Sequence, residues 1–462
     1  MRLMLPVILL SVAASCGSIS PGTPAGPTSI KLITLDPGHF HAALVQKTMY
    51  PGVDSVVQVY APAGADVQLH LERIKGYNTR GESPTSWKEE VYTGSDFMER
   101  MLQEKKGNVV VMSGNNGKKT DYILQALGAG YHVLADKPMA IDKPNFAILQ
   151  KAFATAEKNK MLLYDIMTER YEITTMLQRE FSFLPAVFGE LEKGTAENPA
   201  VTKESVHHFF KYVSGNILTR PPWFMDVAQE GEGIVDVTTH LVDLVQWECF
   251  PNKTLDYQKD IELVSARRWA TPISLSQFNA ITKLNGFPSY LLKDLSNDTT
   301  LKVFSNGEIN YKLKGIHAKV AVTWAYKAPE GTGDTHYSIM RGSKASLVIR
   351  QGAEQGFKPS LYIEPTGGVT ETYAAALQVG LKKVQAAFPG IDVKKTAAGW
   401  EVVIPEKYRE SHETHFARVT EKFLEYLKAG ALPFWEVPNM IAKYYTTTQA
   451  LALALQNGTA AK

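Results

Sequence analysis

The first third of the chain alternates short apolar runs with segments of helical spacing. A β-branched run over 30–36 ends in a turn, and over 41–50 the apolar residues recur three or four positions apart. The alternation continues with strands predicted over 53–61, 108–114, 131–139 and 161–167, and with helices over 120–130 and 145–158. Strands and helices in alternation predict an α/β fold with a parallel, doubly wound sheet.

From about Gly189 the pattern changes to longer runs in which polar and apolar residues alternate, with polar turns between them. Alternation with a period of two is typical of strands that bury one face. The strands are predicted over 190–197, 261–270, 278–284, 301–314, 317–326, 335–342 and 345–352. We expect a C-terminal α/β domain with a large, mostly antiparallel open sheet.

Helical spacing returns near the C-terminus, over 412–429 and again over 438–455. These helices could pack against either part of the chain. A boundary near Tyr164 divides the folded part into a first domain over 30–163 and a second over 164–462. The length of 462 residues suits two domains, each with its own core.

The N-terminus has the features of an export signal: Arg2, a short apolar run over 3–14 and then small residues. The run is shorter than the roughly 20 apolar residues that span a bilayer. The residues Ala-Ala-Ser before Cys16 resemble a bacterial lipobox, in which the cysteine becomes the new N-terminus and carries lipid. We expect a signal peptide over 1–16, a membrane anchor on Cys16, a flexible tether over 17–29 and a periplasm-facing position. An ordinary signal cleaved nearby is the alternative.

The composition narrows the classes of partner and of site. Hydrophobic residues make up 44% of the chain, which is ordinary for a folded protein, and a net charge of +2 gives no field that would attract nucleic acid. If Cys16 carries lipid, Cys249 is the only cysteine left. A disulfide and a cysteine metal site are then excluded.

The first predicted βα turn, DPGHFH over 36–41, stands where a dinucleotide fold places its phosphate loop. Gly38 is all that remains of a GxGxxG pattern, and Gly38, His39 and Phe40 are predicted to contact the cofactor. His39 and His41 also form an HxH pair, but no third metal ligand lies near them in sequence. We expect two polar residues at a helix start and no metal.

The acidic residue that would hold the ribose is less clear. The second predicted strand ends at Ala61, and Asp66 is the nearest acid after it. No arginine stands there to meet an extra phosphate, so NAD is preferred, while NADP is not excluded.

The stretch over 109–141 has the order strand, polar turn, helix ending in glycine, strand, and then Asp136-Lys137-Pro138. It resembles the Gfo/Idh/MocA oxidoreductases, whose members carry a Glu-Lys-Pro motif at this place. The resemblance implies an N-terminal Rossmann-like domain and a catalytic lysine, Lys137, that reaches both nicotinamide and substrate. The residues expected to bind the cofactor here are Ser113, Asn115, Asn116, Asp136, Lys137 and Pro138.

A second stretch, over 223–247, resembles the family's glycine-rich turn followed by a helix with Asp-x-x-x-His. Asp236 and His240 fit that pattern, and Asp243 falls on the same predicted helix face. The resemblance implies that His240 takes the substrate hydroxyl proton and that Asp236 orients it. A solvated polar face is the alternative.

Two weaker matches complete the predicted site. The segment YDIMTERYE resembles the family's entry into the second domain, which places Arg170 and Tyr171 at the cofactor. Arg170, Arg220, Trp223 and Asp243 are predicted to contact the substrate. An aromatic ring beside polar groups suits a sugar.

These features predict an NAD(P)-dependent oxidoreductase that acts on a secondary hydroxyl of a sugar or glycoside. Because free NAD is not expected outside the cytoplasm, an exported member needs a tightly held cofactor that is recycled in each turnover. One alternative is a glycoside-cleaving enzyme that works by transient oxidation and elimination. Another is a non-catalytic carbohydrate-binding lipoprotein on the same fold. The family's open sheet often pairs between subunits, so a homo-oligomer is possible.

Overall fold

The computed structural model describes residues 29–213, 216–330 and 332–460. The predicted signal peptide over 1–16, its lipidation site Cys16 and all but the last residue of the tether lie outside the described residues. Among the helices that are described, none combines the length and the apolar character needed to cross a bilayer.

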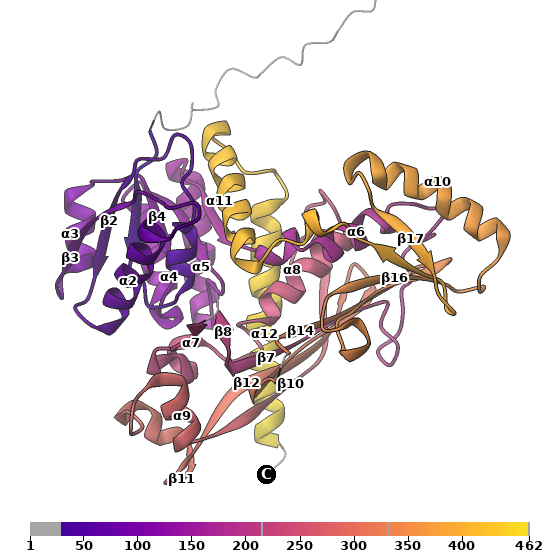
Figure 1. The fold of residues 1–462 in the computed structure, drawn as a ribbon. Coiled ribbons are helices and arrows are strands. Elements are labelled where there is room, and N and C mark those ends of the chain that lie inside the picture. Colours follow the sequence, from indigo (N-terminus) through magenta and orange to yellow (C-terminus); the bar gives the residue numbers. More distant parts are fainter. Residues whose placement is uncertain (1–28, 214–215, 331, 461–462) are drawn as a thin grey trace, which may run out of the picture.

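The N-terminal part forms a six-stranded sheet in which every neighbouring pair of strands is parallel. Its strand order is β3-β2-β1-β4-β5-β6, so the direction of winding reverses between β1 and β4. Helices pack around this sheet (Figure 1). The doubly wound, Rossmann-like domain predicted from the sequence is confirmed. Its elements are β1 (Leu32–Leu35), α1 (His41–Val45), β2 (Val56–Ala61), α2 (Ala65–Thr79), β3 (Lys88–Thr93), α3 (Phe97–Glu104), β4 (Val109–Met112), α4 (Asn116–Gly128), β5 (His132–Asp136), α5 (Lys143–Asn159) and β6 (Leu163–Ile166).

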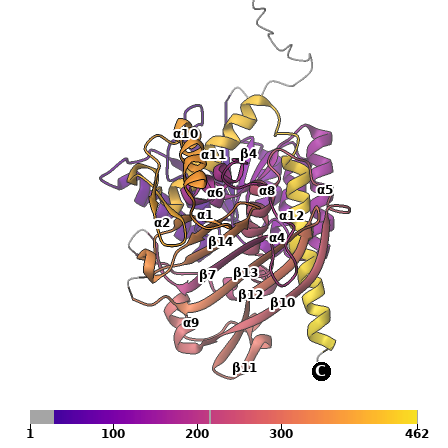
Figure 2. The same ribbon diagram turned by 90° about the vertical axis from the view of Figure 1, so that its right-hand side faces the viewer.

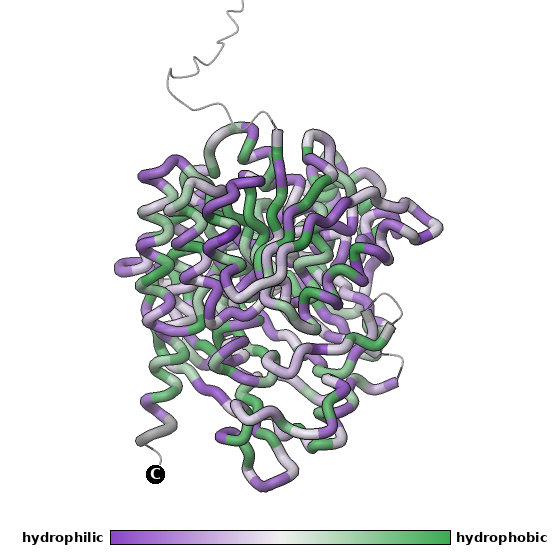
Figure 3. The backbone as a smooth tube through the Cα atoms, turned by 90° about the vertical axis from the view of Figure 1, so that its left-hand side faces the viewer, coloured by the Kyte–Doolittle hydropathy of each residue, from purple (hydrophilic) through white to green (hydrophobic). Residues whose placement is uncertain are grey.

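Local sequence accounts for most of these elements. The central strands β1 and β4 are buried at every position, as expected for strands with helices on both faces. Helix α5 begins where the Asp142 carboxylate accepts a hydrogen bond of 2.8 Å from the Asn145 amide, with Pro144 in its first turn. Figure 3 shows the hydrophobic stretches running through the interior, with hydrophilic stretches at the outer turns.

The second part is built on a ten-stranded sheet in the order β10-β12-β13-β7-β14-β15-β16-β18-β17, with β11 paired to β12. Every pair is antiparallel except β13 and β7. Figure 2 shows β7, β13, β12 and β10 side by side, as the predicted open sheet requires. The strands are β7 (Val201–Phe210), β10 (Ile261–Ser274), β11 (Leu295–Asn297), β12 (Thr300–Leu313), β13 (Ile316–Lys327), β14 (Thr335–Arg341), β15 (Ala345–Arg350), β16 (Ser360–Pro365), β17 (Asp392–Lys395) and β18 (Trp400–Val403), beside a separate pair β8 (Tyr212–Val213) and β9 (Asn216–Ile217).

The strand predicted over 278–284 is wrong, because this segment belongs to helix α9 (Leu275–Thr282). Ser274 and Gln277 form a capping box, in which each side chain bonds the other residue's backbone amide. Phe278 and Ile281, three positions apart, are both fully buried. The helical spacing of the buried residues and the N-terminal cap favour a helix over the strand that the short apolar run predicted.

The strand predicted over 190–197 is also absent. This segment makes only isolated bridges, Leu191 with Gly342 and Gly194 with Pro199. Gly194 has a φ of +64°, a left-handed conformation that breaks a strand. The segment is a loop that bonds to residues of β13 and β14, the two strands that flank β7.

Strand β7 lies at the centre of the sheet but was not predicted, since charged residues interrupt its apolar pattern. Lys203 in β7 is fully buried. Its ammonium donates to both carboxylate oxygens of Glu248 at 2.9 and 2.8 Å and to the Ser338 hydroxyl at 2.9 Å. A charged group with this many hydrogen-bond partners can be buried. Because Glu248 and Ser338 are far from Lys203 in sequence, the sequence pattern gives no sign of this burial.

The connecting helices join the two sheets. Helix α11 (His412–Ala429) has the predicted bounds, and its Phe416 and Phe423 lie in the core of the first domain. Helix α12 (Glu436–Ala460) contributes to both cores and runs between the sheets (Figure 1). The remaining helices are η1 (Thr168–Tyr171), α6 (Ile173–Ser182), η2 (Pro222–Met225), α7 (Val227–Glu230), α8 (Thr238–Cys249), η3 (Ser289–Asp294), η4 (Ala353–Gln355), α10 (Glu371–Ala387) and η5 (Glu406–Tyr408). The boundary predicted at Tyr164 falls within β6, the last strand of the first sheet.

A buried ion cluster links β6, η1, α8 and α12. The Lys443 ammonium lies 2.7 Å from the Asp165 carboxylate and 2.8 Å from the Asp243 carboxylate. Asp243 also pairs with Arg170, which in turn pairs with Glu436. All five side chains are buried, so the cluster fixes the closing helix against both domains.

Candidate active site

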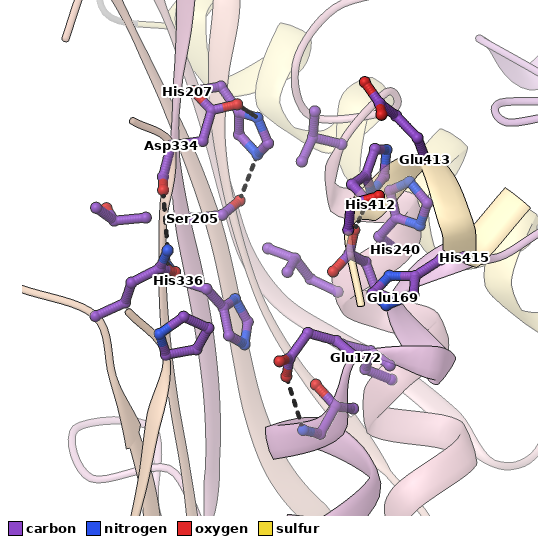
Figure 4. Close-up of a pocket in the computed structure, with 18 of the residues that line it drawn as sticks. Glu169, Glu172, Ser205, His207, His240, Asp334, His336, His412, Glu413 and His415 are labelled. Atoms are coloured by element: carbon purple, nitrogen blue, oxygen red, sulfur yellow. Dashed lines mark hydrogen bonds and ion pairs between the residues drawn. The ribbon is translucent and has the colours of Figure 1, made fainter. Parts of the chain in front are cut away.

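A cavity of about 610 Å³ lies where the first βα turn of the N-terminal domain meets the second domain (Figure 4). Phe40 and His41 line it from the first domain, and residues of η1, β7, α8, β14 and α11 complete its walls. This volume is in the range of small-molecule sites.

One wall is organised around Asp334, next to β14. Its carboxylate lies 3.2 Å from His207 Nδ1, 3.0 Å from His208 Nδ1 and 2.8 Å from the Lys211 ammonium. Burial alone would raise the pKa of Asp334, but these partners lower it far below its usual value. With Nδ1 of His207 bound to Asp334, its Nε2 accepts a hydrogen bond of 3.1 Å from the Ser205 hydroxyl. The Lys211 ammonium is already paired with the Asp334 carboxylate.

The opposite wall carries Glu169, His240, His412 and His415 (Figure 4). Burial, reinforced by the nearby charge of Glu172, raises the pKa of Glu169 to about 7. The Glu169 carboxylate lies 3.5 Å from His412 Nδ1, and burial keeps the pKa of His412 well below its usual value. Glu169 is thus a carboxyl group that carries a proton near neutral pH and faces the cavity.

Lys137 follows β5, and a cis peptide bond joins it to Pro138. Its ammonium forms an ion pair with the Asp236 carboxylate, and both groups are buried. Burial would lower the pKa of Lys137, but Asp236 and Asp136 together raise it above its usual value. Lys137 is therefore a fixed positive charge.

His240 lies in the first turns of α8 and lines the cavity, as predicted. Its Nδ1 is buried and has no hydrogen-bond partner. Burial, and then the charge of Lys137, keep the pKa of His240 well below its usual value. The imidazole is neutral and can accept a proton.

The predicted pairing of Asp236 with His240 is wrong. Helix α8 begins at Thr238, so Asp236 lies in the turn before it and reaches Lys137 instead. Asp243 was expected to share the face that meets the cavity, but it lies in the buried ion cluster with Arg170 and Lys443. A buried carboxylate takes the nearest available cation, which the helix period does not reveal.

The carboxyl ends of β1, β4 and β5 bring together the residues predicted to bind the cofactor. The Asp136 carboxylate accepts hydrogen bonds of 2.8 Å from the Ser113 hydroxyl and 2.9 Å from His41 Nδ1. Asn115 Oδ1 is a buried polar atom without a hydrogen-bond partner, and His39 Nδ1, also buried, lies 3.6 Å from the Asp136 carboxylate. They lie where a doubly wound sheet binds its ligand, at the reversal of strand order. The donor set at this edge therefore fits a dinucleotide.

The other residues predicted for the cofactor meet the segment that covers this edge. A Cβ on Gly38 would lie 2.9 Å from the Trp223 ring, so only glycine fits this approach. The Asn116 amide donates to the Glu230 carbonyl at 2.8 Å, and the Pro138 carbonyl accepts from Lys119 at 3.3 Å.

Two histidines and an acid do meet near the first turn. His39, His41 and Asp136 present ligand atoms within 4.8 Å of one another, which supplies the third group that the HxH pair lacked in sequence. Lys119 and Lys137 lie close enough to shift the pKa values of this group, so two positive charges oppose a cation here.

The residues predicted to contact substrate do not line the cavity. Arg220 is buried, donates to the carbonyls of Phe209 and His208, and stacks on Phe224 at 4.3 Å. The Trp223 indole donates to the Asp66 carboxylate at 2.8 Å, beside the first βα turn. Arg170 and Asp243 are committed to the ion cluster.

Sequence reasoning missed most of the cavity wall. Its unpredicted residues include Glu169 of η1, His207 of β7, Asp334 beside β14 and His412 of α11. The signals present were weak: an acid beside Arg170, and polar residues at the start of an amphipathic helix. Neither signal identifies a site in the sequence, because the residues meet only in the folded protein.

Two family models match the chain. "Oxidoreductase family, NAD-binding Rossmann fold" matches residues 41–165, and "Putative oxidoreductase C terminal domain" matches residues 177–455. The crystal structure of a "putative oxidoreductase" from Parabacteroides merdae is 59% identical, with 94% of this chain and 99% of that chain covered and a TM-score of 0.91.

More distant structures share the fold. KijD10, a 3-ketoreductase from Actinomadura kijaniata in complex with NADP and TDP-benzene, is 14% identical, with 92% of this chain and 97% of that chain covered and a TM-score of 0.53. GenD2 from gentamicin A biosynthesis, in complex with NAD, is 15% identical, with 95% and 98% covered and a TM-score of 0.54. Among curated proteins, none matches significantly.

Proposed function

Because this chain belongs to the Gfo/Idh/MocA oxidoreductases, which bind NAD on a Rossmann domain, we propose that it oxidises or reduces a secondary hydroxyl carbon of a sugar or glycoside. The observation that carries the proposal is the pair formed by charged Lys137 and Asp236, close to a neutral His240 at the cavity. A proton-transfer set of this kind has no purpose in a protein that only binds carbohydrate.

The chain's own residues divide the work of moving the hydroxyl proton. The Lys137 ammonium donates a hydrogen bond to the substrate oxygen and stabilises the negative charge that develops there. His240 accepts the proton, because its imidazole is neutral and lines the cavity. Asp236 keeps Lys137 charged and holds it in place.

The nicotinamide cofactor supplies the hydride acceptor or donor when it is bound. Asn115, whose Oδ1 has no hydrogen-bond partner, would hold it at the carboxyl edge of the sheet together with His39, Ser113 and Asp136. We propose NAD rather than NADP, since no arginine follows β2 closely. Lipidation at Cys16 and a periplasm-facing anchor belong to the same proposal and require that the cofactor stays bound and is recycled.

Denaturing the purified protein is expected to release NAD in a ratio close to one per chain, measured by mass and by nucleotide absorbance. His39→Ala should lower this occupancy, because it removes the imidazole that lies beside Asp136 at the cofactor edge. His317→Ala, on β13, serves as the matched control and should retain NAD. If no nucleotide is released and neither NAD nor NADP binds when added, the proposal fails.

Glu169 favours a second candidate function, glycoside cleavage by transient oxidation and elimination. In that reaction a base removes a proton next to the transient ketone, the bond to the leaving oxygen breaks, and an acid protonates that oxygen. Glu169 faces the cavity and still carries its proton near neutral pH. It could supply the acid step.

If this candidate is correct, Glu169→Gln lowers glycoside cleavage by about 10²-fold or more, while NAD content is unchanged. The raised pKa of Glu169 means that the acid form is present below about pH 7 and is lost above it. Wild-type cleavage should therefore fall as pH rises through 7, and the variant should lose that dependence. Glu157→Gln, on the exposed side of α5, is the control. Undiminished cleavage by Glu169→Gln would exclude the acid role.

A further inference from the structure

The charges around the cavity indicate what kind of sugar it can take. We propose that the cavity admits uncharged glycosides and excludes sugars that carry a phosphate or a carboxylate. This inference rests on the proposed function, since it names the substrate class of the same site.

The cations near the cavity are already engaged. Lys211 pairs with Asp334 at 2.8 Å, and Lys137 pairs with Asp236. Arg220 donates to two backbone carbonyls and lies over the Phe224 ring. A phosphate or carboxylate entering the cavity would have to compete with Asp334 for the partly exposed Lys211 or break the Lys137–Asp236 pair, which would leave Asp236 without its cation.

The histidines of the cavity do not supply positive charge either. Burial lowers the pKa of His41 to about 3, of His336 to about 3 and of His415 to about 4. Burial also holds the pKa of His240 well below its usual value, so its imidazole is neutral. Neutral imidazoles donate and accept hydrogen bonds, which suits sugar hydroxyl groups but does not balance an anion.

Two carboxyl groups face the cavity without a lysine or arginine partner among the described residues. Glu172 accepts hydrogen bonds of 2.7 and 3.1 Å from the amides of Thr174 and Thr175, at the start of α6. Glu169 is held near His412 (Figure 4). An anionic substituent would meet Glu172, and Glu169 once it has ionised, as like charges, whereas a hydroxyl can hydrogen-bond to both groups.

The test uses matched pairs of sugars that differ only at the terminal carbon. Methyl glycosides of glucose, galactose and mannose are compared with the corresponding methyl uronates and 6-phosphates, by calorimetry on the NAD-loaded protein. The neutral glycoside should bind at least about tenfold more tightly than the corresponding uronate or 6-phosphate. The ratio of the affinities for the neutral and the acidic sugar should increase from about pH 6 to about pH 8, as Glu169 ionises. In Glu169→Gln this ratio should not increase with pH.

The outcomes separate this inference from the function on which it rests. If a uronate or a 6-phosphate binds as tightly as the corresponding neutral glycoside, the inference is overturned. The proposal that the protein is a sugar oxidoreductase would still be supported. If the protein carries NAD but binds no sugar of either kind, both the inference and the carbohydrate proposal fail. Because the first comparison uses the unaltered protein, it stands even if Glu169→Gln does not fold.

Discussion

Lys443→Met is expected to lower the free energy of unfolding by about 3–5 kcal/mol, the range measured when one partner of a buried ion pair is removed. Lys443 is fully buried and contacts Asp165 at 2.7 Å and Asp243 at 2.8 Å. Without it, the Asp165 carboxylate keeps only the Tyr444 hydroxyl at 2.9 Å. The loss is read from urea unfolding as a fall in the midpoint at an unchanged slope.

The matched control is Lys422→Met on α11, whose ammonium pairs with Glu425 at the surface. A surface pair of this type contributes at most about 1 kcal/mol, so the control should unfold close to the wild type. Equal effects from the two variants would show that the buried cluster does not fix α12. Restoring stability by combining Lys443→Met with Asp165→Asn would confirm that an unpaired carboxylate causes the loss.

Lys137→Met is expected to lower the rate of substrate oxidation by about 10²–10³-fold, the cost of removing one donor that stabilises a developing negative charge. Lys137 is the buried cation held by Asp236 at the end of β5, and its raised pKa keeps it charged across the physiological range. The rate is followed as reduced nicotinamide appears in the bound cofactor during a single turnover.

The released NAD separates a catalytic loss from a loss of cofactor. Lys137→Met should keep at least part of its nucleotide, because Ser113, Asp136 and His41 remain bonded to one another. Lys151→Met, on an exposed position of α5, should behave as the wild type. Full activity of Lys137→Met would refute its assigned role.

Most of the first domain, and the place of its chemistry, could be predicted from local sequence, although α2, β3 and α3 were not. A strand with helices on both faces is buried at nearly every position, so it is read in the sequence as a short apolar run. The strands β1, β4 and β5 could be predicted for this reason. The Asp136-Lys137-Pro138 motif directly follows such a run, and its position at the sheet's carboxyl edge depends only on local order. The bounds of α11 were predictable for the same reason, since its apolar period is uninterrupted.

Which charged groups meet depends on the packing of elements that are distant in sequence. Helix period put Asp236 and Asp243 on one face with His240, but each carboxylate reaches a cation from a distant element, Lys137 in one case and Lys443 in the other. Strand β7 was missed because Lys203 breaks its pattern and is stabilised by partners far away in sequence. Glu169 and Asp334 face the same cavity from opposite walls only because the fold brings η1 and β14 together. Local periodicity determines which backbone forms, whereas the partner of a buried charge is determined by which elements pack around it.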